Sequence, residues 1–134
     1  MGDVGSTFLG LVFAVMAVIA ARYDHSHTSL FVVPLLLFHF IFDTTFTFLR
    51  RLIGGEKVFM AHRTHLYQLL NRLGCSHGHV TSLYSALGIS QGIAAIWMET
   101  IPGSDRLLVY APFLLTYSAF AWLIIRKAKT RGLI

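Results

Sequence analysis

Long apolar runs separated by short polar segments dominate this chain. The runs cover residues 5–21, 29–49, 80–98 and 107–125. An α-helix rises 1.5 Å per residue, so about 20 residues cross a hydrocarbon core of about 30 Å, and each run is close to that length. The pattern predicts an all-α integral membrane bundle of about four transmembrane helices. The first run is the shortest and needs the residues before it, or thinner lipid, to span.

The composition agrees with lipid as the main solvent. Of the 134 residues, 55% are hydrophobic and only 13% are charged, with a mean hydropathy of +0.66. A water-soluble domain carries about a quarter of its residues as charged side chains. The single cysteine, Cys75, excludes an internal disulfide and a multi-thiolate metal site.

The Lys and Arg residues are unevenly distributed among the polar segments. Most lie in the long segment 50–79 or in the tail after residue 125, whereas the other two loops carry only Arg22 and Arg106. Because orientation follows the Lys and Arg bias of short loops, we expect a multi-pass plasma membrane protein with the long loop and both termini in the cytoplasm. The net charge of +5 also suits anionic lipid headgroups or an anionic substrate.

The first candidate for chemistry is the opening segment Met-Gly-Asp-Val-Gly-Ser, which contains Asp3. Glycines on both sides of an acid let the backbone approach a ligand, and a carboxylate offers hard oxygen to Mg²⁺. Asp3 and Ser6 could equally be first-turn and capping residues of a helix.

The second candidate is Asp43, an acid inside an apolar run. Such residues are costly in a membrane and are functional by default. Arg50 follows two helical turns later on the same face, so an ion pair within the bundle is one structural alternative, and a hydrogen bond to Thr47 is another. His39, one turn before Asp43, is expected to hydrogen-bond to it.

The third candidate is the stretch 61–72, Ala-His-Arg-Thr-His-Leu-Tyr-Gln-Leu-Leu-Asn-Arg. On a helix, His62 and His65 at positions i and i+3 would face the same way, with Arg72 further along. Imidazole and guanidinium donors suit phosphate oxygens. A zinc site is the competing idea, but two histidines without a thiolate or carboxylate nearby form an incomplete ligand set.

Together, in this order, the three segments resemble the polyprenyl-phosphate N-acetylhexosamine-1-phosphate transferases of bacterial membranes, glycosyltransferase family 4. The opening segment resembles an acidic motif of the superfamily to which that family belongs. The stretch from Asp43 to Arg51 and the stretch from Ala61 to Gln68 resemble its cytoplasmic loop. The resemblance covers about residues 1–84, and the combination is more specific than any one piece.

The resemblance implies transfer of an N-acetylhexosamine 1-phosphate from a UDP-sugar to undecaprenyl phosphate at the bacterial inner membrane. The product would start a lipid-linked cell-surface polysaccharide. It implies a catalytic Mg²⁺ bound by Asp3 and a catalytic pair formed by His62 and His65. The implied substrate-binding residues are Arg50, Arg51, Arg63, Gln68 and Asp43.

The same comparison predicts that the chain is incomplete. Family members begin well upstream and carry two further acidic motifs that are absent here, so we expect the chain to be the C-terminal part of a transferase, with little activity alone. The alternative is a noncatalytic membrane module or half of a split transferase, with a separately encoded N-terminal half or a homodimer as partner. A solute carrier would need more intramembrane charges. No nucleic-acid partner is expected, since no reading module is evident.

Overall fold

The computed structural model describes residues 3–24, 28–57, 60 and 63–134. This part of the chain is all helical, as the apolar pattern predicted. Its elements are α1 (Asp3–Tyr23), α2 (Thr28–Leu36), α3 (Phe38–Ile53), α4 (Leu66–Arg72), α5 (His77–Met98), the 3₁₀ helix η1 (Gly103–Val109) and α6 (Tyr110–Thr130).

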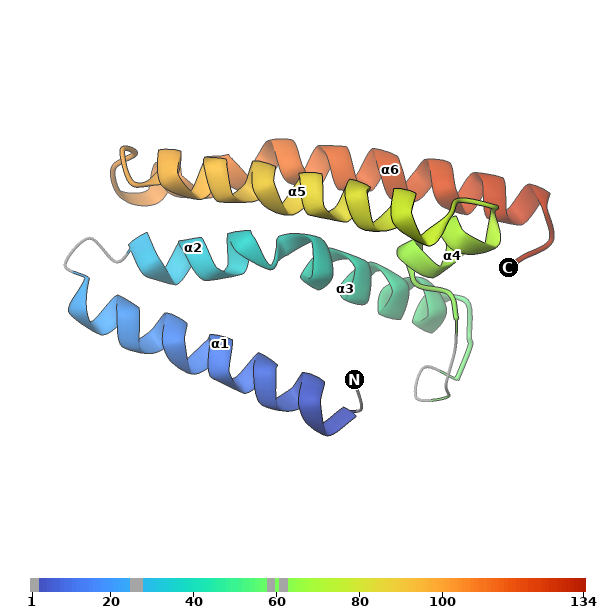
Figure 1. The fold of residues 1–134 in the computed structure, drawn as a ribbon, viewed down its shortest axis with the longest axis horizontal. Helices are drawn as coiled ribbons and strands as arrows, with labels where there is room; N and C mark the ends of the chain where they lie inside the picture. The colour runs from blue at the N-terminus through green and yellow to red at the C-terminus, as the bar shows by residue number, and fades with distance from the viewer. Residues whose placement is uncertain (1–2, 25–27, 58–59, 61–62) are drawn as a thin grey trace.

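The long helices run in alternating directions across an elongated molecule (Figure 1). In this view α5 and α6 lie on one side, α2 and α3 in the middle and α1 on the other side. α1 packs on α2 and diverges from α3, which leaves a cavity of about 690 Å³ lined by residues including Leu9, Phe13 and Phe40. The end of α3, the short helix α4 and the end of α6 lie together at one end of the molecule, and the part of the chain from the end of α3 through α4 is named the α3–α4 segment.

The expected helix 29–49 is broken, which corrects the prediction of one continuous helix. α2 ends at Leu36, α3 begins at Phe38, and the two axes differ by 68°. Pro34 lies inside α2 just before the break, where it lacks an N–H donor and its ring crowds the preceding turn. The expected loop 50–79 is also shorter, since α3 continues to Ile53, α5 begins at His77 and α4 lies between them.

Two small clusters of buried side chains hold the helices together. In one, Leu66 and Leu69 of α4 pack on Ala121, Ile124 and Ala128 of α6. The alanines let the short helix approach α6 closely, so α4 is anchored on the last helix of the chain. The second cluster joins α2, α5 and η1 through Leu35, Ala95, Met98 and Val109.

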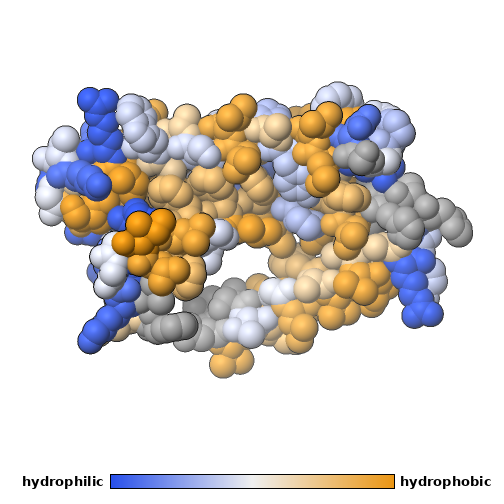
Figure 2. Space-filling model, turned by 180° about the vertical axis from the view of Figure 1, so that it is seen from behind, coloured by the Kyte–Doolittle hydropathy of each residue, from blue (hydrophilic) through white to orange (hydrophobic). Residues whose placement is uncertain are grey.

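The outer surface is strongly apolar. Hydrophobic residues cover the middle of the face shown in Figure 2, and hydrophilic residues gather at its two ends. Among the described helices, only 105–130 is long and apolar enough to cross a membrane alone, and 22% of its apolar window is buried. The bent pair of α2 and α3 would make a second span, and 7–23 is a shorter apolar helix. This surface fits a membrane protein, and four crossings stay a prediction.

Candidate functional site

A buried carboxylate joins α3 to the start of α4. The Asp43 side chain is 5% exposed, and its Oδ1 accepts the Thr47 hydroxyl at 3.1 Å and the backbone N–H of Leu66 at 2.9 Å. Leu66 is the first residue of α4, whose first N–H groups have no partner within the helix. Asp43 therefore caps α4 from another helix, and the hydrogen bond to Thr47, one of the two structural alternatives for this acid, is present.

His65 lies beside the same carboxylate. Its Nδ1 is 3.4 Å from Asp43 Oδ1, and its backbone N–H donates to Gln68 Oε1 at 3.3 Å. His65 has extended backbone angles (φ −62°, ψ 152°) and stands immediately before α4. The helical spacing expected for the two histidines is therefore wrong for His65, because the helix begins one residue later. His62 lies outside the described residues.

The adjacent arginines at the end of α3 have different environments. Arg51 is 5% exposed, and it donates to Glu56 Oε2 at 2.8 Å and to the Lys57 carbonyl at 2.8 Å. Arg50 donates through Nη2 to the Thr64 carbonyl at 3.4 Å. Arg51 thus orders the residues that follow α3, whereas Arg50 reaches the residues that precede α4.

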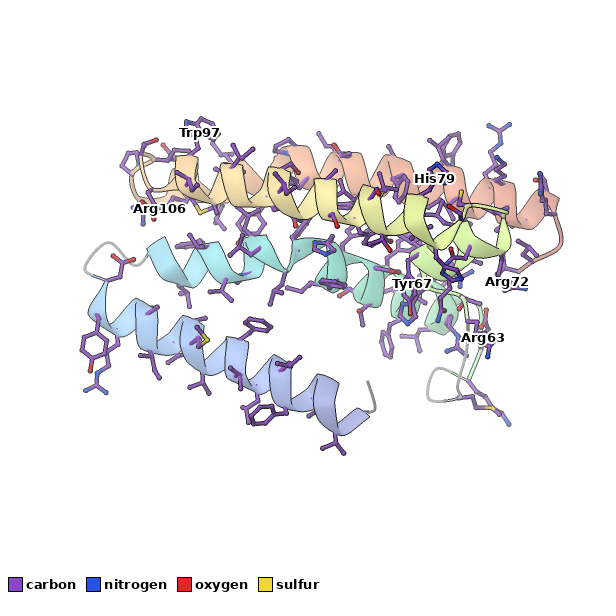
Figure 3. All side chains as sticks on the ribbon, in the orientation of Figure 1. Arg63, Tyr67, Arg72, His79, Trp97 and Arg106 are labelled. Carbon is purple, nitrogen blue, oxygen red and sulfur yellow. The ribbon has the colours of Figure 1, made fainter. Side chains whose placement is uncertain are left out.

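The other predicted site residues lie around this junction or at the start of the chain. Arg63 is exposed, and its carbonyl accepts from Arg72 at 3.4 Å. Figure 3 shows both side chains at the end of the molecule that also holds Tyr67 and His79. Asp3 opens α1, and Figure 1 shows this end of α1 in the same half of the molecule as the α3–α4 segment.

The described residues provide no ready-made metal cage. Within 3–24, 28–57, 60 and 63–134, no group of three His, Cys, Asp or Glu side chains is close enough to hold an ion. The Asp3 side chain lies outside what the structure describes, and Mg²⁺ is often bound through only one or two carboxylates with water and substrate phosphates, so a metal role for Asp3 stays a prediction.

Sequence reasoning missed a second buried polar cluster. The ring of His39 lies 2.8 Å from the side chain of Gln91 on α5, and Gln91 lies 3.2 Å from the Tyr117 hydroxyl on α6. His39 thus bonds to Gln91 and not, as expected, to Asp43. A glutamine inside an apolar run was the available signal, since polar side chains there need partners.

Gln91 also contacts the break between α2 and α3. With its amide oriented to satisfy the surrounding groups, it donates to the Leu36 carbonyl at 3.3 Å and accepts the His39 backbone N–H at 3.2 Å. Breaking a helix inside an apolar bundle frees such backbone groups, and each costs free energy unless another group pairs with it. Gln91 therefore stabilises the break.

The positively charged side chains are distributed unevenly between the two ends of the molecule. Arg63 and Arg72 lie at one end in Figure 3, and Arg106 lies at the other, where it donates to the Ile101 carbonyl at 2.8 Å. Lys127 and Lys129 in the last turns of α6 lie at the end shared with the α3–α4 segment. Among the described residues, positive charge is therefore concentrated at the end of the molecule where α3 meets α4.

The fold and this site describe an all-helical protein with an apolar surface and one basic end. The chain is similar to the probable undecaprenyl-phosphate N-acetylglucosaminyl 1-phosphate transferase of Bacillus subtilis (strain 168), with 28% identity over 100 residues. The match covers 75% of the chain and 28% of the length of that relative. No family model and no solved structure matches the chain.

Proposed function

We propose that the chain is part of a membrane transferase that moves an N-acetylhexosamine 1-phosphate from a UDP-sugar to undecaprenyl phosphate. The structural observation that carries the proposal is the attachment of the His65 segment to Asp43 at the basic end of the helices. The similarity to the Bacillus subtilis relative supports the same activity.

The reaction needs positive charge around two phosphates and an apolar environment for the acceptor's polyprenyl chain. An oxygen of the lipid phosphate attacks the phosphorus attached to the sugar, a new diphosphate link forms, and the bond to UMP breaks. Donors that neutralise the nonbridging oxygens lower the barrier to such a step. The basic end and the apolar helix surfaces meet at the α3–α4 junction, so this region would suit both requirements.

The residues beside the junction suggest a division of roles. His65, held next to Asp43, would donate to the sugar nucleotide diphosphate together with His62 and the exposed Arg63. Gln68 and Arg50 would hold the residues before α4 in place, since both already bond to residues 64–65. Asp43 and Arg51 would act by holding the segment in position. Asp3 would bind Mg²⁺, which supplies charge neutralisation to the diphosphate.

The test is UMP release by the membrane-embedded chain, supplied with undecaprenyl phosphate and UDP-N-acetylglucosamine. The chain is assayed alone and coexpressed with the part of the Bacillus subtilis relative that it does not match. We expect UMP release on coexpression, and a loss of at least tenfold for His65→Ala. His79→Ala is the matched control, because His79 is an exposed histidine that bonds to Ser76 instead. Absence of UMP release in both arrangements would refute the transferase proposal.

A further inference from the structure

An amphipathic cavity lies between the ends of α3 and α6. Its volume is about 530 Å³, and its walls include Phe46 and Leu49 of α3 and Ile125 of α6. Two cationic side chains also line it, Arg50 from α3 and Lys129 from α6. The cavity therefore combines an apolar wall with positive charge from two helices that are far apart in sequence.

The Arg50 side chain supplies positive charge to this cavity. Its Nη2 bonds to the Thr64 carbonyl, and its Nε is buried with no hydrogen-bond partner among the described residues. Because the guanidinium charge is delocalised over the whole group, Arg50 attracts an anion in the cavity although its buried Nε is not open to it.

Glu56 is the one acidic side chain that lines the cavity. It forms a 2.8 Å ion pair with the buried Arg51, and its charge also acts on Arg50. Three cations, Arg50, Arg51 and Lys129, therefore lie around one acidic side chain, and this excess of positive charge favours an anionic occupant.

The level of the cavity relative to the ends of the apolar helices indicates the kind of anion. Arg50 lies near the end of the bent α2–α3 pair, and Lys129 lies near the end of 105–130. Cations at the ends of spanning helices lie at the level of the lipid headgroups, with apolar side chains one or two turns deeper at the level of the acyl chains. A free anion would use the cations only, whereas a lipid would also cover Phe46, Leu49 and Ile125.

We propose that this cavity binds an anionic phospholipid of the bilayer, with its phosphodiester between Arg50 and Lys129 and an acyl chain along the apolar wall. The lipid would join α3 to α6 at the end of the bundle where α4 packs between them. The proposal does not depend on the transferase activity, because its test uses no sugar nucleotide.

The experiment is native mass spectrometry of the full chain, delipidated in detergent and titrated with phosphatidylglycerol or phosphatidylcholine. We expect one phosphatidylglycerol to bind more tightly than phosphatidylcholine. Lys129→Gln should weaken phosphatidylglycerol binding about fivefold, the effect of removing one cation near a lipid surface. Lys127→Gln is the matched control, since it removes the same charge from an exposed residue of α6 that does not line the cavity.

A second variant tests the apolar wall. Leu49→Trp puts a larger side chain into the cavity and should weaken phosphatidylglycerol binding while both cations remain. Equal losses in the Lys127 and Lys129 variants would show general surface attraction and overturn the proposal. One-for-one displacement of phosphatidylglycerol by added undecaprenyl phosphate would overturn it too, because the cavity would then be the binding site of the acceptor lipid.

Discussion

The Asp43 carboxylate accepts the backbone N–H of Leu66 at 2.9 Å, so a side chain on one helix forms the N-terminal cap of another. The chain between these two residues contains three of the predicted nucleotide-binding residues, His62, Arg63 and His65. Together with the 3.4 Å contact between Asp43 Oδ1 and His65 Nδ1, this hydrogen bond holds His65 beside α3.

Replacing Asp43 should loosen the start of α4. Asp43→Leu leaves the Leu66 N–H buried and unpaired, so we expect a loss of about 2 kcal/mol in the free energy of unfolding. Asp43→Asn keeps an acceptor oxygen and should cost about half as much. Unfolding by SDS titration in detergent micelles measures both. Equal stability of the Leu variant and the unmodified protein would show that the cap contributes nothing.

Replacing Arg51 should release the residues that follow α3. Arg51→Leu removes the donors to Glu56 and to the Lys57 carbonyl, and because Glu56 is half exposed we expect a loss of only about 1–2 kcal/mol. Backbone hydrogen exchange should rise over residues 54–57. Arg131→Gln, at an exposed arginine of the tail, is the control and should leave exchange in that segment unchanged.

Replacing Gln91 should destabilise the break between α2 and α3. Gln91→Leu removes the partner of the His39 ring and of the Leu36 carbonyl, which should cost about 1–2 kcal/mol in the same SDS titration. Ser90→Leu changes the adjacent, exposed residue of α5 and should alter stability by less than about 0.5 kcal/mol. If both variants lost the same stability, the amide would have no special role.

The orientation predicted from the Lys and Arg bias can be tested through Cys75, which is exposed between α4 and α5. A membrane-impermeant maleimide should label Cys75 in inside-out vesicles and not in intact cells. In a Cys75→Ser background, Thr100→Cys at the opposite end of α5 should show the reverse pattern. Labelling of Cys75 from outside intact cells would contradict a cytoplasmic loop.

The helical class of the protein could be predicted from sequence because apolar runs of this length leave few other solutions. The break at Leu37 could not, since Pro34 is compatible with several bends and Gln91, which pairs with backbone groups at the break, comes from a helix distant in sequence. For the same reason, the sequence placed His39 next to Asp43, but the ring bonds to Gln91. Periodicity along one helix does not show which partner a neighbouring helix presents.

Part of the candidate site could likewise be predicted from the sequence, and part could not. The bond between Asp43 and Thr47 could be predicted because both lie on one helix face, one turn apart. The contact of Asp43 with Leu66 and His65 depends on how the chain returns after α3, and no local pattern encodes that path. Helical spacing failed at His65 because α4 begins only after it. The roles of Asp3 and His62 stay predictions.

The packing of α4 has a consequence for the order in which the helices can assemble during synthesis. Its N-terminus is capped by Asp43, which is synthesised earlier, but Leu66 and Leu69 are covered by Ala121, Ile124 and Ala128 of α6, which are synthesised later. During biosynthesis, the short helix that follows His65 therefore cannot bury its leucines until α6 has joined the bundle. A chain that stalls before α6 exposes both leucines.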